Sequence, residues 1–252
     1  MNYNIHFSPT GGTQRVADLF ARSFGGEWVT IDLCDRHQDF SRFSFTGEDV
    51  CLISAPAYGG RVPAAAMERL GQMRGDSTPT ILNAVFGNRA IDDTLLELKD
   101  SLSPLGFRCM GAMETVAEHS IVRQVATGRP NVDDRVQLAQ FAAQLREKLS
   151  AGAPAEVEVP GNRPFRASGG TPFKPVGNAL CVHCGLCAQE CPVGAIPEDD
   201  LTGVDKALCI SCLRCVRICP QNCRSVNPRP MAATCAKMKT GCSVPKENKL
   251  YI

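Results

Sequence analysis

Eight of the fourteen cysteines form two copies of one short pattern, and this repeat constrains the chain more than any other feature. Each copy reads C-x-x-C-x-x-C-x-x-x-C-P, and the second copy begins 28 residues (209 − 181) after the first. Their cysteines are Cys181, Cys184, Cys187 and Cys191, then Cys209, Cys212, Cys215 and Cys219. Closely spaced thiolates of this kind can surround one face of an iron–sulfur cube, so the repeat predicts two [4Fe–4S] clusters.

The fourth cysteine of each copy is expected to cross to the cluster of the other copy, as in the bacterial two-cluster pattern. Cluster I then takes Cys181, Cys184, Cys187 and Cys219. Cluster II takes Cys209, Cys212, Cys215 and Cys191. Crossing explains the repeat, because neither half completes its site alone. The alternative is two structural zinc sites, but zinc ribbons use two C-x-x-C pairs and have no use for a third cysteine followed by C-P.

The cysteines, with Pro192 and Pro220 after the crossing ligands, make residues 178–228 resemble bacterial-type bis-[4Fe–4S] ferredoxins. We expect a small α+β ferredoxin domain over residues 179–228. About 50 residues bury little core, so the clusters are expected to hold this domain together. His183 lies between two ligands and is expected to point away from the cluster.

Residues 1–150 alternate short apolar runs with helical patterns. Strands are expected at Asn4–Ser8, Trp28–Leu33, Val50–Ala55, Thr80–Phe86 and Phe107–Thr115. Helices are expected at Gln14–Phe24, Pro63–Gln72, Asp92–Pro104 and Val132–Leu149. Residues 50–53 form a continuous apolar run, which is typical of a strand covered on both faces. The alternation predicts an α/β domain with right-handed crossovers and a doubly wound, five-stranded parallel sheet.

The first expected strand leads into the loop Ser8-Pro9-Thr10-Gly11-Gly12-Thr13, and a helix follows. The hydroxyls of Ser8, Thr10 and Thr13 can donate to a phosphate oxygen. Gly11 and Gly12 allow backbone amides to face an anion at the helix N-terminus. The loop has no lysine, so it is neither a Walker loop nor a G-x-G-x-x-G dinucleotide loop. The alternative is an ordinary strand-to-helix turn with an N-cap.

This loop and the order of elements resemble the flavodoxins, in which FMN binds outside the first and third strands. The resemblance implies that the phosphate lies at residues 8–13 and that two further loops flank the isoalloxazine. Their residues are Pro56, Ala57, Tyr58, Gly59 and Gly60 after the third strand, and Phe86, Gly87, Asn88 and Arg89 after the fourth. Tyr58 is the best candidate to stack on the ring. Nearly the whole chain resembles the flavodoxin–ferredoxin fusion proteins of anaerobic bacteria and archaea, which implies FMN and two cubane clusters in electron transfer.

Two arginines set this chain apart from low-potential flavodoxins, which keep acidic surroundings near the ring. Arg61 and Arg89 lie in the flavin loops, and neither loop contains Asp or Glu. Their charge would favour an anionic reduced flavin, unless both side chains point to solvent. His119 follows the fifth strand and either relays a proton at the flavin edge or is a plain loop residue. His6 is expected to be a buried, hydrogen-bonded histidine.

Two further segments complete the organisation. Residues 151–178 are rich in proline and glycine and predict a linker, either a free tether or a strip packed through Phe165 and Phe173. Residues 229–252 carry five basic and one acidic side chains without clear periodicity, and we expect a basic C-terminal tail. Six cysteines remain outside the repeat. Cys51 and Cys109 are expected in the core, whereas Cys223, Cys235 and Cys242 are spaced too loosely for a third cubane.

The sequence predicts an electron carrier between FMN and two [4Fe–4S] clusters that serves a partner oxidoreductase. No catalytic acid, base or nucleophile stands out beside the flavin. The alternative is an FMN-dependent reductase of a small acceptor, a quinone or an activated alkene, fed by the clusters. The chain has no basic domain, so its charge does not indicate nucleic-acid binding. No apolar run approaches the length of a membrane-spanning helix. Clustered thiols without an export signal predict the cytoplasm of an anaerobe.

Overall fold

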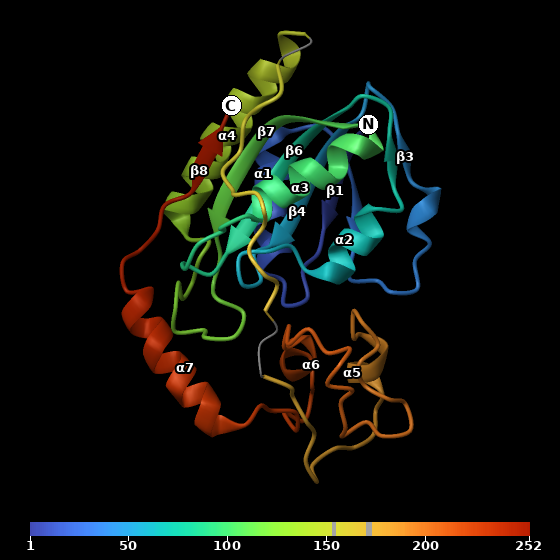
Figure 1. Ribbon diagram of the computed structural model, residues 1–252, viewed down its shortest axis with the longest axis vertical. Helices are drawn as coiled ribbons and strands as arrows, with labels where there is room; N and C mark the ends of the chain where they lie inside the picture. Colours follow the sequence, from blue (N-terminus) through green and yellow to red (C-terminus); the bar gives the residue numbers. More distant parts are fainter. Residues whose placement is uncertain (153–154, 170–172) are drawn as a thin grey trace.

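A computed structural model describes residues 1–152, 155–169 and 173–252, and its centre is a six-stranded sheet in the order β2-β1-β4-β6-β7-β8 (Figure 1). The strands are β1 (Asn2–His6), β2 (Trp28–Asp32), β4 (Val50–Pro56), β6 (Thr78–Phe86), β7 (Phe107–Val116) and β8 (Lys249–Tyr251). The first five pair in parallel, as predicted. Their order along the chain is 2-1-3-4-5, which is the flavodoxin-like doubly wound order.

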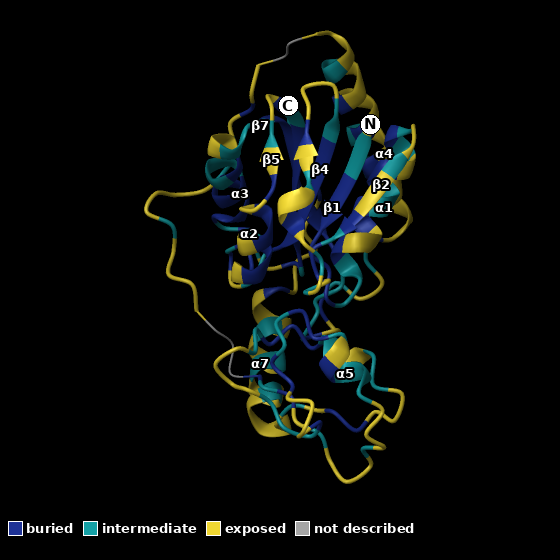
Figure 2. Ribbon diagram, turned by 90° about the vertical axis from the view of Figure 1, so that its right-hand side faces the viewer, coloured by how far each residue is buried: buried dark blue, intermediate teal, exposed yellow. Residues whose placement is uncertain are grey.

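Four helices cover the sheet in two layers, and they match the predicted helices closely. Their bounds are α1 (Gly12–Phe24), α2 (Ala64–Leu70), α3 (Thr94–Leu102) and α4 (Val132–Ser150). Leu52 of β4 packs with α1 and α4, whereas its neighbour Ile53 packs with α2 and α3. The continuous apolar run therefore fills both cores, and the buried residues concentrate in this sheet (Figure 2).

Short elements fill the remaining connections of this domain. They are the 3-10 helices η1 (Phe40–Arg42) and η2 (Ser103–Leu105) and a two-stranded sheet of β3 (Ser44–Phe45) and β5 (Arg74–Gly75). In the described parts of the chain, no helix has both the length and the apolar character to cross a membrane.

Residues 173–227, which we call the cysteine-rich part, lie beyond the carboxyl end of the parallel strands (Figure 1). They contain the one-turn helices α5 (Leu186–Gln189) and α6 (Arg214–Arg217), and an isolated bridge joins Val176 to Ser225. Their apolar core is small, and its buried residues are Ala188, Cys191, Ala195, Ile196 and Leu201. A core of this size agrees with the expectation that bound clusters hold this part together.

The prediction of a basic tail over residues 229–252 is wrong, because this segment forms ordered structure. Helix α7 (Pro228–Gly241) leads back from the cysteine-rich part, and β8 pairs antiparallel with β7 through Ala112 and Tyr251 (Figure 1). Helix α7 buries none of its residues, although Cys235 and Met238 pack at helical spacing against Val122 and Val125. β8 has only three residues, so the signal of both elements in the sequence is weak. The sheet consequently gains a sixth, antiparallel strand that the five-stranded prediction lacks.

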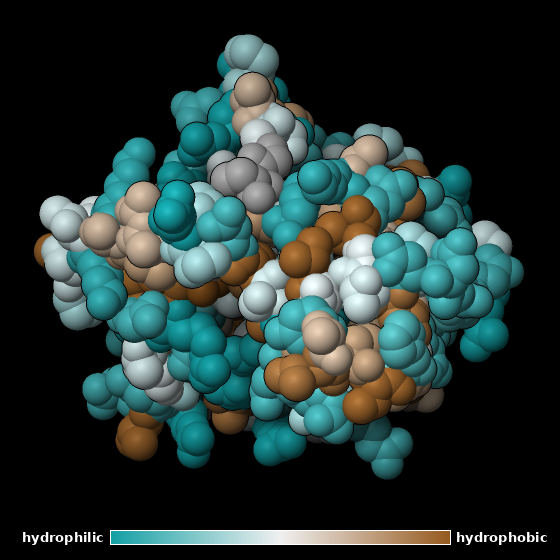
Figure 3. All heavy atoms as spheres, turned by 90° about the horizontal axis from the view of Figure 1, so that it is seen from below, coloured by the Kyte–Doolittle hydropathy of each residue, from teal (hydrophilic) through white to brown (hydrophobic). Residues whose placement is uncertain are grey.

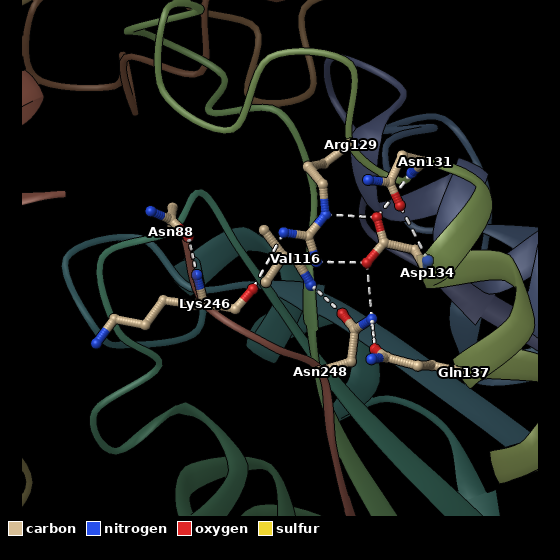
Figure 4. A network of polar contacts seen from close by, with 8 residues as sticks. All are labelled: Asn88, Val116, Arg129, Asn131, Asp134, Gln137, Lys246 and Asn248. Carbon is tan, nitrogen blue, oxygen red and sulfur yellow. Dashed lines mark hydrogen bonds and ion pairs between the residues drawn. The ribbon is translucent and has the colours of Figure 1, made fainter. Parts of the chain in front are cut away.

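A polar network holds the returning segment against the sheet (Figure 4). Buried Asn248 accepts a hydrogen bond from the Val116 amide at 2.8 Å and donates to Asp134 Oδ1 at 2.8 Å. It also donates to Gln137 Oε1 at 2.7 Å. Asp134 forms an ion pair with Arg129, which lies before α4. The end of the chain is therefore fastened by buried polar contacts.

Residues 157–166 of the segment 151–178 pack along α3, so this stretch is a packed strip and not a free tether. The Val157 amide donates to the Cys109 carbonyl at 2.9 Å, and the Val157 side chain joins the core. Arg163 pairs with Asp100 at 2.6 Å, and Phe165 stacks under Arg61. Pro154, Gly170 and Pro172, which the linker prediction includes, lie outside the described residues.

Candidate redox site

Two hollows in the cysteine-rich part collect the eight thiols of the repeat. The first, hollow I, is lined by Cys181, Cys184, Cys187 and Cys219, and its empty space, open solvent included, is about 350 Å³. The second, hollow II, is lined by Cys191, Cys209, Cys212 and Cys215, and its empty space, open solvent included, is about 330 Å³. The thiols surround each hollow and do not converge on a point: within residues 1–152, 155–169 and 173–252, no three His, Cys, Asp or Glu side chains could hold one metal ion.

Each hollow thus gathers the four thiols that the sequence assigns to one cluster, including the one that crosses from the other copy. Sets of four thiols are the donors that [4Fe–4S] clusters use, so the residues present fit the clusters. Their role as ligands stays a prediction. Burial raises the pKa of Cys212 to about 12 and that of Cys215 to about 11. These thiols would carry their protons unless a metal replaced them.

The two cysteine loops share one backbone design, which explains how the repeat folds. His183 and Ser211 occupy equivalent positions, and both have positive φ angles, 54° and 56°. Gly185 and Leu213 are likewise equivalent, with φ angles of 77° and 62°. These left-handed residues turn the chain between successive cysteines, and the amide of Ser211 donates to Cys209 Sγ at 3.4 Å. His183 is exposed, which agrees with its expected place outside the cluster.

A fifth thiol lines hollow I, and the sequence interpretation missed it. Cys223 is 3 % exposed, and its Sγ lies 3.4 Å from Cys219 Sγ. Cys223 therefore belongs to the surroundings of hollow I, a place that its loose spacing from Cys235 and Cys242 does not indicate. The signal in the sequence is its position four residues after the crossing ligand, where the chain turns back at Asn222 with a φ of 50°.

The loop of residues 8–13 has the form that an anion needs. Gly11 takes a φ of 83° and is the N-cap of α1, where it offers no side-chain cap of its own. A Cβ at Gly11 would meet nothing within 4 Å, so the loop is open at this position. Ser8 Oγ accepts from the Gln14 amide at 2.8 Å and keeps its own hydrogen available to donate. These features fit a phosphate at the helix N-terminus.

An arginine of the cysteine-rich part supplies the charge that this loop lacks. Arg217 Nη2 lies 3.4 Å from the Thr10 carbonyl oxygen, and its Nη1 lies 3.7 Å from Glu118 Oε1. Burial and the charge of Arg123 lower the pKa of Arg217. Glu118 also pairs with Arg123 at 2.6 Å, so the arginines outnumber the carboxylate near this loop.

Tyr58 lies between the sheet and the cysteine-rich part. Burial raises the pKa of Tyr58 well above its usual value. The charges of Cys212 and Cys34 add to this rise, whereas the hydroxyl of Ser120 opposes it. Cys34 in turn accepts a hydrogen bond from the Ser8 amide at 3.2 Å, and burial raises its pKa too. Tyr58 therefore connects the expected FMN loops with a predicted ligand of cluster II; its stacking on a flavin stays a prediction.

The proposed effect of Arg61 and Arg89 on the flavin stays a prediction, and the structure shows which carboxylates compete for both side chains. Arg61 forms a two-point ion pair with Glu97, at 2.8 and 2.7 Å, and also donates to the Arg166 carbonyl. Arg89 pairs with Asp92, which belongs to the same loop region. Arg61 is thus balanced by its own carboxylate and is only 19 % exposed, so it does not point freely to solvent. Arg89 shares Asp92 with Arg166 and is 39 % exposed, so its charge is only partly balanced.

The remaining loop residues are placed as follows. The side-chain amide of Asn88 bonds to the C-terminal segment: it donates to the carbonyls of Cys242 and Val244 and accepts from the Lys246 amide.

Phe86 belongs to the core under α2 and α3. Pro56 ends β4, Ala57 continues its ladder to Val85, and Gly59 is exposed with a φ of 63°. Asn88 and Phe86 thus serve the fold with their side chains, and only their backbones remain for a cofactor.

Two glycines of these loops are required by packing between loops. A Cβ at Gly60 would lie 2.1 Å from Asp92 Oδ2, and one at Gly87 would lie 2.5 Å from His119 Cδ2. His119 Nδ1 accepts from the amides of Ile121 and Val122, at 3.1 and 3.0 Å. Burial, followed by the charge of Arg89, lowers the pKa of His119, so its ring is neutral. The contacts of His119 therefore stabilise the loop that covers Gly87.

His6 is buried as predicted, with an exposed fraction of 1 %, but the predicted hydrogen bonds are absent. Among the described residues, neither of its ring nitrogens has a hydrogen-bond partner. Its Nδ1 lies 3.8 Å from Asp32 Oδ1, which is an electrostatic contact only. Burial lowers the pKa of His6.

Hollow II faces the carboxyl end of the sheet because several contacts join the two parts there. Buried Arg69 of α2 donates to the carbonyls of Leu33 and Pro192, one from each part. Val193 and Ile210 of the hollow pack against the main core of the sheet. The cysteine-rich part is thus docked on the edge where the loops of residues 8–13 and 56–60 emerge (Figure 1).

Comparison with known proteins gives one family match in the cysteine-rich part, and solved structures that are similar over somewhat more than half of the chain. Residues 175–196 and 202–225 match the family model described as a 4Fe-4S binding domain, which confirms the expected ferredoxin resemblance. No curated protein sequence matches the chain. Similar solved structures include a flavodoxin of Streptococcus pneumonia TIGR4 (18% identity, TM-score 0.41, 58% of this chain and 98% of that one). Others are the Megasphaera elsdenii flavodoxin (16%, 0.38, 57% and 99%) and Flavodoxin 2 from Bacillus cereus (14%, 0.43, 58% and 98%).

Proposed function

We propose that this chain, which joins a flavodoxin-like domain to a 4Fe–4S binding domain, transfers electrons between bound FMN and two [4Fe–4S] clusters and serves a partner oxidoreductase. FMN supplies two-electron chemistry, and each cluster accepts one electron at a time. The loop of residues 8–13 would hold the phosphate, and the loops of residues 56–60 and 86–89 would flank the ring. The eight thiols of the repeat would hold the clusters in the crossed arrangement.

The observation that supports this function most is the docking of hollow II on the carboxyl end of the sheet. Arg69 fixes the Pro192 carbonyl there, and Cys212 lies within electrostatic reach of Tyr58 and Cys34. The thiols proposed for cluster II are thus held beside the loops proposed for FMN. Joining both centres in one chain raises the effective concentration of each near the other.

The partner is proposed to approach hollow I, which is open to solvent. Cys184 is exposed, and the apolar side chains of Leu180 and Val182 beside it are 65 % and 60 % exposed. Figure 3 shows this end of the molecule, where apolar groups interrupt a largely polar surface. Exposed apolar groups next to a redox centre suit a transient protein contact. The oxygen sensitivity of thiolates and clusters makes the cytoplasm of an anaerobe the proposed location.

The alternative, a reductase of a quinone or an activated alkene, fits the structure less well. Such an enzyme needs an open ring face for its substrate. Here the cysteine-rich part contacts Thr10 through Arg217 and Leu33 through the Arg69 bridge, so it occupies the end of the sheet where the ring is expected. A small acceptor would have to share this end with the cluster domain, which favours the electron carrier.

The test uses the full chain, purified without oxygen and loaded with FMN and iron–sulfide. We expect a flavin spectrum with a broad iron–sulfur shoulder and about eight iron atoms per chain. After a laser flash that reduces the flavin, the iron–sulfur absorbance should bleach at a rate independent of protein concentration. A rate that rises with concentration would reject intramolecular transfer, and absence of bound flavin or of iron would reject the function. Quinone reduction that outpaces the bleaching would favour the reductase.

A further inference from the structure

A buried arginine lies between the two hollows, outside every motif that the sequence interpretation used. Arg224 directly follows Cys223 and is only 2 % exposed. Its Nη2 donates to the carbonyls of Pro175 and Gly203, at 2.8 and 2.9 Å, and its Nη1 donates to the Leu201 carbonyl. Two separate stretches of the cysteine-rich part, at Pro175 and at residues 201–203, therefore meet at one guanidinium.

Neutral carbonyls do not balance the charge of this guanidinium. No carboxylate among the described residues forms an ion pair with Arg224, and its Nε has no hydrogen-bond partner there. The carboxylate of Asp200 feels its charge only weakly and is bonded instead to Thr202 and Gly203. A charge taken out of water is costly unless an opposite charge compensates it. The fold thus buries a cation whose counter-charge must come from elsewhere.

Sulfur atoms of both cysteine groups lie next to this cation. Arg224 lines hollow I, and its Nη1 lies 3.9 Å from Cys187 Sγ, a predicted ligand of cluster I. Its guanidinium also interacts with the Cys215 sulfur, a predicted ligand of cluster II. One positive charge is therefore shared between the two groups of thiols.

We propose that Arg224 is the common counter-cation of the two clusters and raises the reduction potential of both. This inference rests on the proposed function, because it requires clusters in both hollows. Each one-electron reduction adds one negative charge to a cluster, without any bond forming or breaking, and the electron comes from FMN or from the partner. A fixed cation nearby stabilises the more negative, reduced state. Arg224 tunes the clusters and is not itself oxidised or reduced.

The test measures the potentials of both clusters in the FMN-loaded full chain by anaerobic titration followed with electron paramagnetic resonance. Arg224→Gln removes the charge and keeps donors for the carbonyls. We expect the one-electron equilibrium constant for reduction to fall at least tenfold for each cluster, which is a shift of about 59 mV. Arg224→Lys keeps the charge and should restore most of the shift. Arg229→Gln, an exposed cation in α7, is the matched control and should change the constants less than twofold.

The outcomes separate this inference from the proposed function. If Arg224→Gln carries full iron and either cluster keeps its wild-type potential within twofold in equilibrium constant, the counter-cation role is refuted. If Arg224→Gln loses its clusters, Arg224→Lys decides: wild-type potentials support the role of the charge, whereas a lysine variant as impaired as the glutamine variant shows that only the shape of the guanidinium matters. If the wild type itself takes up no iron, the proposed function fails.

Discussion

Replacing Asn248 by alanine should unfasten the C-terminal segment and destabilise the sheet domain. The change removes three buried hydrogen bonds, to the Val116 amide, the Asp134 carboxylate and the Gln137 side chain. The bond to the carboxylate is worth about 1.5–3 kcal/mol and each neutral bond about 0.5–1.5 kcal/mol. Since part of this free energy returns when water enters, we expect a loss of about 3 kcal/mol in the free energy of unfolding.

The assay is urea unfolding followed by the fluorescence of Trp28, the only tryptophan of the chain. Trp28 lies in β2 with its ring 5.5 Å from that of Phe24, so it reports on the sheet domain. With an m-value of about 3 kcal/mol/M, the urea midpoint should fall by about 1 M. Glu247→Ala changes the exposed neighbour and should leave the midpoint within the range of ordinary surface substitutions, about 0.5 kcal/mol. A loss below about 1 kcal/mol for Asn248→Ala would refute the view that this segment is an integral part of the domain.

Three further predictions follow from the site. Arg217→Gln should weaken FMN binding about tenfold but leave riboflavin binding unchanged, because it removes one charge-assisted contact to the phosphate; equal effects on both flavins, measured by fluorescence quenching, would contradict this. Cys219→Ala should retain about eight iron atoms because Cys223 can replace the lost thiol, whereas the double variant should lose about four; a single variant that already loses four would argue against the substitute ligand. Burial lowers the pKa of His119 below its unfolded value of 6.5, so the unfolded chain binds the extra proton first and stability should fall as the pH drops below about 6.5. His119→Asn, which keeps an acceptor for the loop amides, should reduce this loss between pH 7.5 and 5.5, and an unchanged pH profile would assign it to other groups.

The parallel strands and the grouping of the cysteines could be predicted because local patterns determine them. The two-faced apolar run in β4 and the repeated cysteine step need no knowledge of distant residues. The roles of individual polar side chains could not be predicted in this way. Arg61 forms an ion pair with Glu97, which is 36 residues away in the sequence. Asn88 donates hydrogen bonds to backbone carbonyls that are more than 150 residues away. Side-chain direction in these loops depends on which distant segment arrives beside them.

The C-terminal segment is hard to predict for a different reason. Helix α7 buries none of its residues, and its apolar contact with Val122 and Val125 is made by only Cys235 and Met238, with Cys242 just after the helix. An apolar stripe this narrow is a weak signal of a period of 3.6 residues. β8 covers the edge of β7, and an uncovered edge strand invites pairing with other chains. The need for this cover is a feature of the folded sheet, and the three residues of β8 alone do not express it.

The return of the chain to the sheet also bears on electron transfer. The cysteine-rich part has a small core of its own and is attached at both ends, by residues 155–169 packed along α3 and by α7 leading to β8. Two attachments restrict its movement much more than one flexible linker would. Arg69 and Arg217 add contacts at the face between the parts, so the covalent connections favour the arrangement in which hollow II lies against the loops proposed for FMN. The two attachments would hinder a domain that had to swing far away to meet its partner. Under the proposed function, hollow I would instead meet the partner while hollow II stays docked, and electrons would pass without movement of the domain.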